Sequence, residues 1–137
     1  MSKNILLYIK EEGFISTSYY IDKEEQIYSI NSELNNLAKR YFLSLPYYRK
    51  SVNKQLGLKY NIPIYFSPTL LLFRLKSKNV VYYINYFNIL KICYEEGVVI
   101  IFKGGHILEV EVKKKVVLQQ LQKIDQILVY MNKLELW

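Results

Sequence analysis

The stretch VVIIFKGGHILEVEV, residues 98–112, contains the clearest signal for the fold. Its first five residues are apolar and β-branched or aromatic, which predicts a buried strand. The pair Gly104-Gly105 permits the positive φ angles of a tight hairpin turn. From residue 107 onward apolar and acidic residues alternate, which predicts a second strand with Leu108, Val110 and Val112 facing inward. The stretch therefore predicts an antiparallel β-hairpin.

A helix is predicted directly after this hairpin, near residues 114–134. Apolar residues recur there at steps of three and four, which places them on one face of a helix: Val117, Leu121, Ile124, Leu128 and Met131. Such a stripe covers a sheet or a partner helix. A dimer seam is the alternative, although the stripe is too short to define a coiled coil.

The first half of the chain predicts further strands and one more helix. Residues 4–10, 14–21 and 26–30 read as strands, and residues 61–66 and 69–75 follow as two short ones. Between these two groups, Leu34, Leu37, Tyr41 and Leu45 share one face of a predicted helix near residues 32–45. We expect Asn31 or Ser32 to cap this helix and Pro46 to end it.

Together these elements predict an α+β fold. It consists of a mostly antiparallel sheet, one helix near residues 32–45 and a C-terminal helix near residues 114–134. Residues 80–92 remain ambiguous between strand and helix, because they are rich in Tyr, Ile and Phe without a clear period. The length of 137 residues and an apolar fraction of 51% fit a single folded domain spanning residues 1–137.

The charge is distributed unevenly along the chain. Residues 34–94 contain ten Lys and Arg and no Asp or Glu, a charge of +10. The segment before them has a charge of −3, and the segment after them is neutral. So long a basic segment without an acid favours a polyanionic partner, and nucleic acid is the most common one.

The candidate contact surface lies inside this basic segment. Residues 47–59 are polar, basic and aromatic, and they predict a loop followed by an exposed strand or ribbon. A second basic cluster lies at a strand end near residue 76. Tyr47, Tyr48, Tyr82, Tyr83 and Tyr86 either stack on bases or lie half-buried in a sheet. The candidate DNA-binding residues are Lys39, Arg40, Arg49, Lys50, Lys54, Arg74, Lys76 and Lys78.

No residue pattern supports an enzyme, a cofactor or a metal site. The single histidine, His106, follows the glycine pair and is expected to be an exposed turn residue. The single cysteine, Cys93, is expected to be a small buried residue, and one cysteine fits a reducing interior. No apolar run is long enough to span a membrane, so we expect a cytoplasmic, nucleoid-associated protein.

Two stretches resemble the competence transcription factor family of Gram-positive bacteria, ComK. The first contains Tyr41, Ser44 and the basic pair Arg49-Lys50, and an apolar strand begins after it at Pro63. The second runs from Phe102 through the glycine pair and the alternating strand to Gln119. Between them, residues 83–89 are similar to a Trp-x(5)-Ile motif of the family, with Tyr in place of Trp.

The resemblance covers about residues 4–125 and departs from the family at several positions. Tyr48 stands where the family has Gly, the Phe-Pro-Ser/Thr signature is not intact, and no clear counterpart of the C-terminal adaptor-binding tail is present. The resemblance implies a competence-type transcription activator that contacts A+T-rich double-stranded DNA through the minor groove. It also implies dimers or pairs of dimers, and an adaptor of regulated proteolysis as a partner.

Two other functions remain open at this point. A LytTR-like regulator is also β-rich and of similar size, but it reads the major groove. A protein-interaction or regulatory module of another class would use the basic face to bind an acidic partner.

Overall fold

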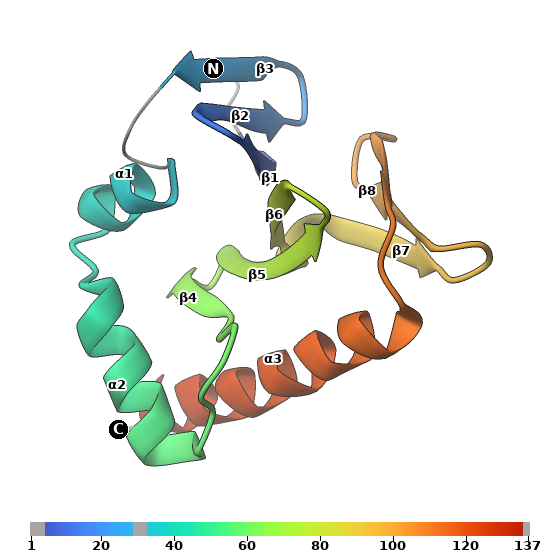
Figure 1. The fold of residues 1–137 in the computed structure, drawn as a ribbon. Helices are drawn as coiled ribbons and strands as arrows, with labels where there is room; N and C mark the ends of the chain where they lie inside the picture. Colours follow the sequence, from blue (N-terminus) through green and yellow to red (C-terminus); the bar gives the residue numbers. More distant parts are fainter. Residues whose placement is uncertain (1–4, 29–32, 136–137) are drawn as a thin grey trace.

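The computed structural model describes residues 5–28 and 33–135 of the chain. Two antiparallel sheets and three α-helices make up these residues, which confirms the predicted α+β class (Figure 1). Their buried apolar side chains belong to one core that both sheets and all three helices share. Asn31 and Ser32, one of which was expected to cap the first helix, lie outside the described residues.

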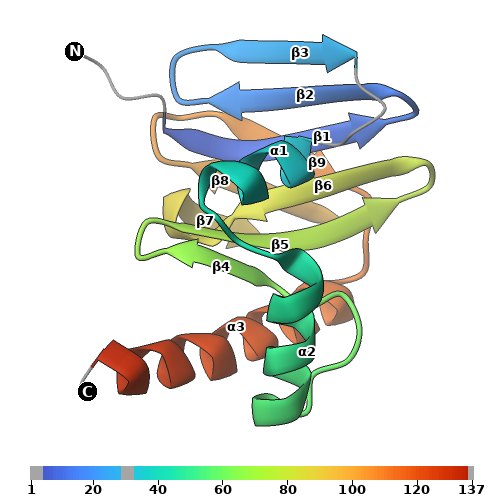
Figure 2. The same cartoon turned by 90° about the vertical axis from the view of Figure 1, so that its left-hand side faces the viewer.

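The larger sheet has six strands in the order β3-β2-β1-β6-β5-β4 (Figure 2). They are β1 (Leu6–Glu12), β2 (Ile15–Tyr20), β3 (Glu24–Tyr28), β4 (Ile64–Ser67), β5 (Leu70–Ser77) and β6 (Val80–Asn85). In the register of this sheet, Tyr83 of β6 lies between Ile9 of β1 and Arg74 of β5. These three side chains therefore share one face, because side chains directly opposite each other in a sheet point the same way.

The smaller sheet has three strands in the order β7-β8-β9. They are β7 (Ile89–Cys93), β8 (Val98–Phe102) and β9 (Ile107–Val110), and the 3₁₀ turn η1 (Tyr86–Asn88) separates β6 from β7. The ambiguous residues 80–92 are thus two strands joined by this turn. The predicted hairpin is confirmed: Gly104 and Gly105 have φ angles of 93° and 92°, and the Phe102 amide donates to the His106 carbonyl at 2.9 Å.

The two sheets pack against each other through aromatic side chains. The ring of Tyr8 in β1 stacks on Phe102 of β8, with ring centroids 5.4 Å apart. Helices α1 (Glu33–Arg40) and α2 (Leu45–Leu56) lie over the opposite face of the larger sheet (Figure 2). Since Tyr8 and its neighbour Ile9 point to opposite faces, the face that contains Arg74 is the one beside α2.

The C-terminal helix α3 (Lys114–Glu135) is confirmed, and it lies along the β4–β5 end of the larger sheet (Figures 1 and 2). In its predicted apolar stripe, Val117 and Ile124 are fully buried, whereas Leu121, Leu128 and Met131 are partly buried. Buried Gln120 donates from Nε2 to the Arg74 carbonyl at 2.9 Å. This hydrogen bond attaches α3 to β5.

The helix predicted near residues 32–45 is instead two helices. Phe42 has a φ of 54°, which interrupts the first helix, and α2 starts just beyond it. Pro46 occupies the first turn of α2, where a missing N–H costs nothing and the fixed φ of proline favours a helix. Ser44 caps α2 by accepting from the Tyr47 amide at 3.4 Å. The prediction that Pro46 ends a helix, and that residues 47–59 form a loop and a ribbon, is therefore wrong.

Candidate nucleic-acid interface

Helix α2 presents an exposed basic face. Its inner side consists of Leu45, Tyr48 and Val52, which are all buried. Tyr47, Lys50 and Lys54 follow one another at steps of three and four on the outer side, and all three are exposed. Tyr47 is 72% exposed. None of the twelve residues of α2 is acidic, so its outer face is uniformly suited to an anionic partner.

Tyr48 fixes α2 to the sheet. Its hydroxyl donates to the Pro63 carbonyl at 2.8 Å and accepts from the Tyr65 amide at 3.1 Å. Burial raises the pKa of Tyr48 to about 12, so the hydroxyl keeps its proton at neutral pH. Tyr48 is thus a structural residue and does not stack on bases, whereas its neighbour Tyr47 is free to contact a partner from the outer face of α2.

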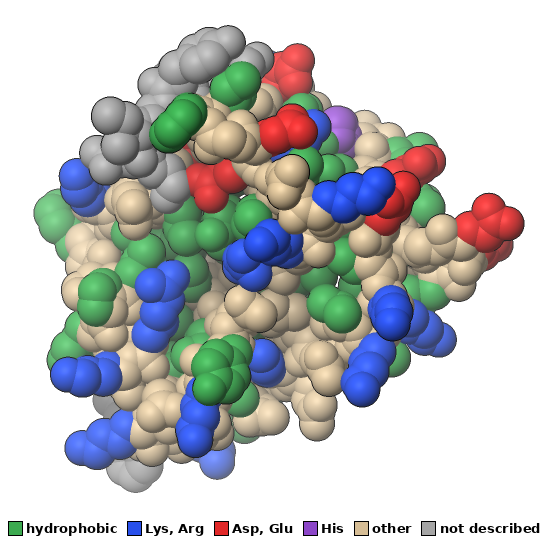
Figure 3. Space-filling view, in the orientation of Figure 1, with side chains coloured by type: hydrophobic (Ala, Val, Ile, Leu, Met, Phe, Trp, Pro, Cys, Tyr) green, Lys and Arg blue, Asp and Glu red, His purple; other side chains and the backbone are tan. Residues whose placement is uncertain are grey.

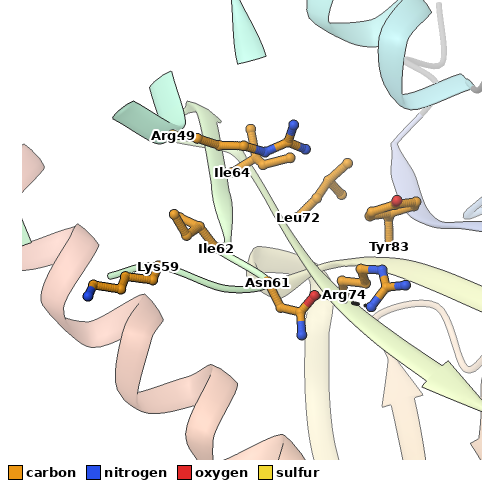
Figure 4. Close-up of a pocket in the computed structure, with 8 residues that line it drawn as sticks. All are labelled: Arg49, Lys59, Asn61, Ile62, Ile64, Leu72, Arg74 and Tyr83. Carbon is orange, nitrogen blue, oxygen red and sulfur yellow. Dashed lines mark hydrogen bonds between the residues drawn. The ribbon is translucent and has the colours of Figure 1, made fainter. Parts of the chain in front are cut away.

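A cavity of about 220 Å³ lies between α2 and the larger sheet (Figure 4). Arg49 enters it from α2, and Arg74 and Tyr83 enter it from β5 and β6. In Figure 4 both guanidinium groups extend toward the Tyr83 side of the cavity. The other lining residues are Lys59, Asn61, Ile62, Ile64 and Leu72.

A hydrogen bond holds one of the two arginines in place. The Arg74 guanidinium donates from Nη1 to Asn61 Oδ1 at 3.1 Å, and its positive charge acts on the Tyr83 hydroxyl. Burial raises the pKa of Tyr83 most, and Glu11 raises it further, while the positive charges of Arg74 and Arg49 lower it. Both guanidinium groups therefore lie close enough to the Tyr83 hydroxyl to act on it electrostatically.

The loop between α2 and β4 supplies the remaining polar lining. Gly57 ends α2 with a φ of 72°, and Asn61 has a φ of 46°, so two left-handed residues turn the chain back toward the sheet. Lys123 of α3 holds this loop by donating to the Tyr60 carbonyl at 2.6 Å. The Lys59 ammonium points away from the two arginines in Figure 4, so only its stem lines the cavity.

The other predicted site residues lie at different positions relative to the cavity. Lys76 lies two residues after Arg74 on β5, and therefore on the same face, where it is exposed. Lys39 is exposed at the end of α1. Arg40 pairs with the buried carboxylate of Glu33 at 3.5 Å.

Lys78 is the predicted site residue that belongs elsewhere. It lies in the turn after β5 and pairs with Glu111, beyond β9, at 3.5 Å. The structure thus brings Arg49 and Arg74 together, places Lys50 and Lys54 beside them on the outer face of α2, and directs Lys78 toward the smaller sheet.

The space-filling view shows how charge is distributed on one side of the molecule (Figure 3). Lys and Arg side chains gather over the lower half, where α2 and α3 lie in Figure 1. The Asp and Glu side chains of the described residues that are visible from this side lie in the upper half. This side of the molecule is therefore basic in its lower half, where residues of α2 and α3 lie.

Sequence reasoning missed two residues of the cavity, Asn61 and Tyr83, as site residues. Tyr83 was considered only as a stacking or sheet aromatic. Its position opposite Arg74 depends on the β5–β6 register, and a recognised hairpin at Ser77-Lys78-Asn79 would have supplied that pairing. Asn61 was missed because its role depends on a left-handed backbone, which Asn adopts more readily than most residues.

The prediction for His106 is also corrected. It is partly buried, and its Nε2 lies 2.8 Å from the Tyr8 hydroxyl within a cluster of aromatic rings that includes Tyr19 and Phe102. It therefore packs the glycine turn onto β1 instead of pointing into solvent.

Cys93 is only partly buried. Within residues 5–28 and 33–135, no cluster of His, Cys, Asp or Glu has the composition of a metal site.

Helix length and hydrophobicity bear on the membrane prediction. In the described part of the chain, no helix has both the length and the apolar composition that a membrane span requires.

The chain was also compared with known proteins. No protein-family model, curated protein or solved structure matches it.

Proposed function

We propose that this protein binds double-stranded DNA through the basic surface around α2 and acts as a transcriptional regulator. The observation that carries the proposal is the outer face of α2, where Tyr47, Lys50 and Lys54 form a continuous exposed line without an acidic residue. Lys and Arg neutralise backbone phosphates and release counterions, which supplies most of the affinity of such interfaces.

The surface extends beyond α2 on both sides. Lys39 lies at the end of the preceding helix, and Lys76 lies on the same face of the sheet as Arg74. Phosphate contacts from several elements fix the orientation of a protein on a duplex, whereas contacts to base edges give sequence preference. We assign the phosphate contacts to these lysines and to Lys50 and Lys54.

The resemblance to ComK favours A+T-rich DNA and contact through the minor groove. In that mode Arg49 is the inserted side chain, because a narrow A+T-rich minor groove has an enhanced negative potential that attracts arginine. Arg49→Ala is then expected to weaken binding by about 1–3 kcal/mol and to flatten the sequence preference.

A specific observation favours the major groove as the second candidate. Helix α2 is exposed, firmly attached through Tyr48 and capped at both ends, and the major groove of B-DNA admits an α-helix. Gln55 is also exposed on α2, and amide side chains read adenine edges in the major groove. This mode shares with the LytTR-like alternative only the use of the major groove.

A salt titration with two duplexes tests the proposal. Binding to an A+T-rich and a G+C-rich duplex is measured at several salt concentrations, and about four to six neutralised phosphates give a log–log slope of roughly −4 to −5. A drug that occupies the minor groove then separates the modes, because it displaces only a minor-groove binder. Absence of duplex binding at low salt would overturn the proposal and leave an acidic protein as the partner of this surface.

The resemblance also supports self-association into dimers or pairs of dimers and recognition by an adaptor of regulated proteolysis. We further propose that the protein is located at the nucleoid in the cytoplasm. Analytical ultracentrifugation of the free protein tests the first of these parts directly.

A further inference from the structure

We infer that the cavity between α2 and the larger sheet is a binding site for a phosphate group at the end of a small molecule or a nucleic-acid strand. Its central residues are Arg49, Arg74 and Tyr83, and its volume is about 220 Å³ (Figure 4). The inference shares Arg49 with the minor-groove mode proposed above but does not use the lysine line, which lies on the outer side of α2 and does not line the cavity.

The chemistry of the lining selects an anion with several oxygens. Two guanidinium groups reach the same side of the cavity from different elements, and each presents a planar fork of N–H donors. A carboxylate has two oxygens, which a single fork satisfies. A terminal phosphate has three, so it can bond Arg49, Arg74 and the Tyr83 hydroxyl at once.

The electrostatics of the cavity also favour an anion. The ion pairs Lys23–Glu25, Arg40–Glu33 and Lys78–Glu111 do not involve the two arginines of the cavity. Glu11 acts on the Tyr83 hydroxyl from β1, and it does not line the cavity. The two guanidinium groups repel each other, and a bound dianion reduces this repulsion.

Arg74 is prepared for such a ligand. Its bond to Asn61 orients the guanidinium before any ligand arrives, so less side-chain entropy is lost on binding. An arginine has five N–H donors, and this bond leaves others for the ligand.

Size and shape define the class of ligand further. The volume is below the range of about 300–1,000 Å³ of pockets that enclose drug-sized molecules. The floor consists of Ile62, Ile64 and Leu72, which suits a small apolar or planar portion next to the phosphate. A recessed cavity of this size accepts a terminal phosphate, whereas the phosphates within a duplex lie on a broad continuous backbone.

Titration with inorganic phosphate tests the inference without DNA. Calorimetry at constant ionic strength, with chloride as the competing anion, is expected to give a Kd of about 1 mM or tighter. Arg49→Ala is expected to weaken phosphate binding by about tenfold or more, because a charge-assisted hydrogen bond is lost. Arg49→Lys retains the charge but loses the fork, so it should also weaken binding.

Lys103→Ala is the matched control, since it removes one exposed positive charge from the β8–β9 turn, outside both the cavity and the lysine line. Thermal unfolding of each variant verifies that it is folded, and the Arg side-chain Nε–Hε signals in NMR spectra report whether Arg74 contacts the phosphate. Phosphate binding that is no tighter than chloride binding, or that Lys103→Ala weakens as much as Arg49→Ala, would overturn the inference.

Two further probes identify the source of the phosphate. A nucleoside 5′-monophosphate represents small metabolites, and a short single strand with a 5′-phosphate is compared with the same strand ending in a 5′-hydroxyl. Tighter binding of the phosphorylated strand supports a site for nucleic-acid ends. Equal binding of the two strands, with tight binding of the monophosphate, supports a site for a small ligand.

Discussion

The hydroxyl of Tyr48 lies 2.8 Å from the carbonyl oxygen of Pro63, to which it donates a hydrogen bond. It also accepts from the amide of Tyr65 at 3.1 Å. One buried side chain of α2 thus provides hydrogen-bond partners for two backbone groups at the start of β4. This contact fixes the orientation of the helix relative to the sheet, and therefore also the direction in which the lysines of its outer face point.

Replacement of Tyr48 by Phe tests the strength of this attachment. The variant leaves the Pro63 carbonyl and the Tyr65 amide without their partner, so the free energy of unfolding should fall by about 1–3 kcal/mol. Urea unfolding measures the change. Tyr47→Phe is the control, because its hydroxyl belongs to a side chain that is 72% exposed, and it should have almost no effect. Equal stability of the two variants would show that the two hydrogen bonds contribute little.

The same residue predicts a dependence of stability on alkaline pH. Burial raises the pKa of Tyr48 to about 12, above its ordinary value of about 10. Between these values the unfolded chain releases the proton while the folded protein keeps it, so the stabilisation is complete below about pH 10 and is lost as pH approaches 12.

Burial also raises the pKa of Tyr8 and Tyr83, so Tyr48→Phe should show a shallower decline instead of none. Urea unfolding of the parent and the variant between about pH 9 and pH 12 measures the difference. Parallel declines in the two proteins would contradict the assignment to Tyr48.

The glycine turn between β8 and β9 gives a prediction with an internal control. Gly104 and Gly105 have almost the same positive φ, but a Cβ on Gly104 would lie 3.3 Å from Cγ2 of Ile21, while a Cβ on Gly105 would have no atom within 4 Å. Both substitutions by Ala strain the backbone, at a cost of about 1 kcal/mol or more.

Gly104→Ala should therefore reduce the midpoint temperature of thermal unfolding more than Gly105→Ala does. The difference between the two variants isolates the contact between this turn and the β2–β3 loop. A larger effect at Gly105 would indicate that the turn does not pack on Ile21 in solution.

The hairpin was predictable from the sequence because its signals are local. The glycine pair determines the turn, and the alternation after it determines which side chains face inward, as buried Leu108 and Val110 confirm. The C-terminal helix was predictable for the same reason, since a period of three and four residues continues over its whole length. Both elements require no information from distant parts of the chain.

Helix α2 and the cavity were not predicted, for physical reasons that differ. In the sequence, Pro46 is compatible both with the end of one helix and with the first turn of another. Which of the two forms depends on the capping by Ser44 and on the burial of Tyr48. The convergence of Arg49 with Arg74 depends on how α2 lies over the sheet. That packing results from contacts between residues far apart in the sequence, which no local pattern contains.

Lysines of α2 give the most direct test of the DNA-binding surface. Lys50→Ala combined with Lys54→Ala removes two exposed charges from the outer face of the helix without changing its buried side. If each lysine contacts one phosphate, duplex affinity falls and the log–log salt slope becomes less negative by roughly two.

Lys103→Ala is the control for this variant, because Lys103 is also exposed but lies in the turn of the smaller sheet, away from α2. It should change the salt slope little. Fluorescence anisotropy with a labelled A+T-rich duplex measures all three proteins under the same conditions. An unchanged slope in the double variant would exclude the outer face of α2 from the interface, whereas equal loss in the double variant and Lys103→Ala would indicate attraction by net charge alone.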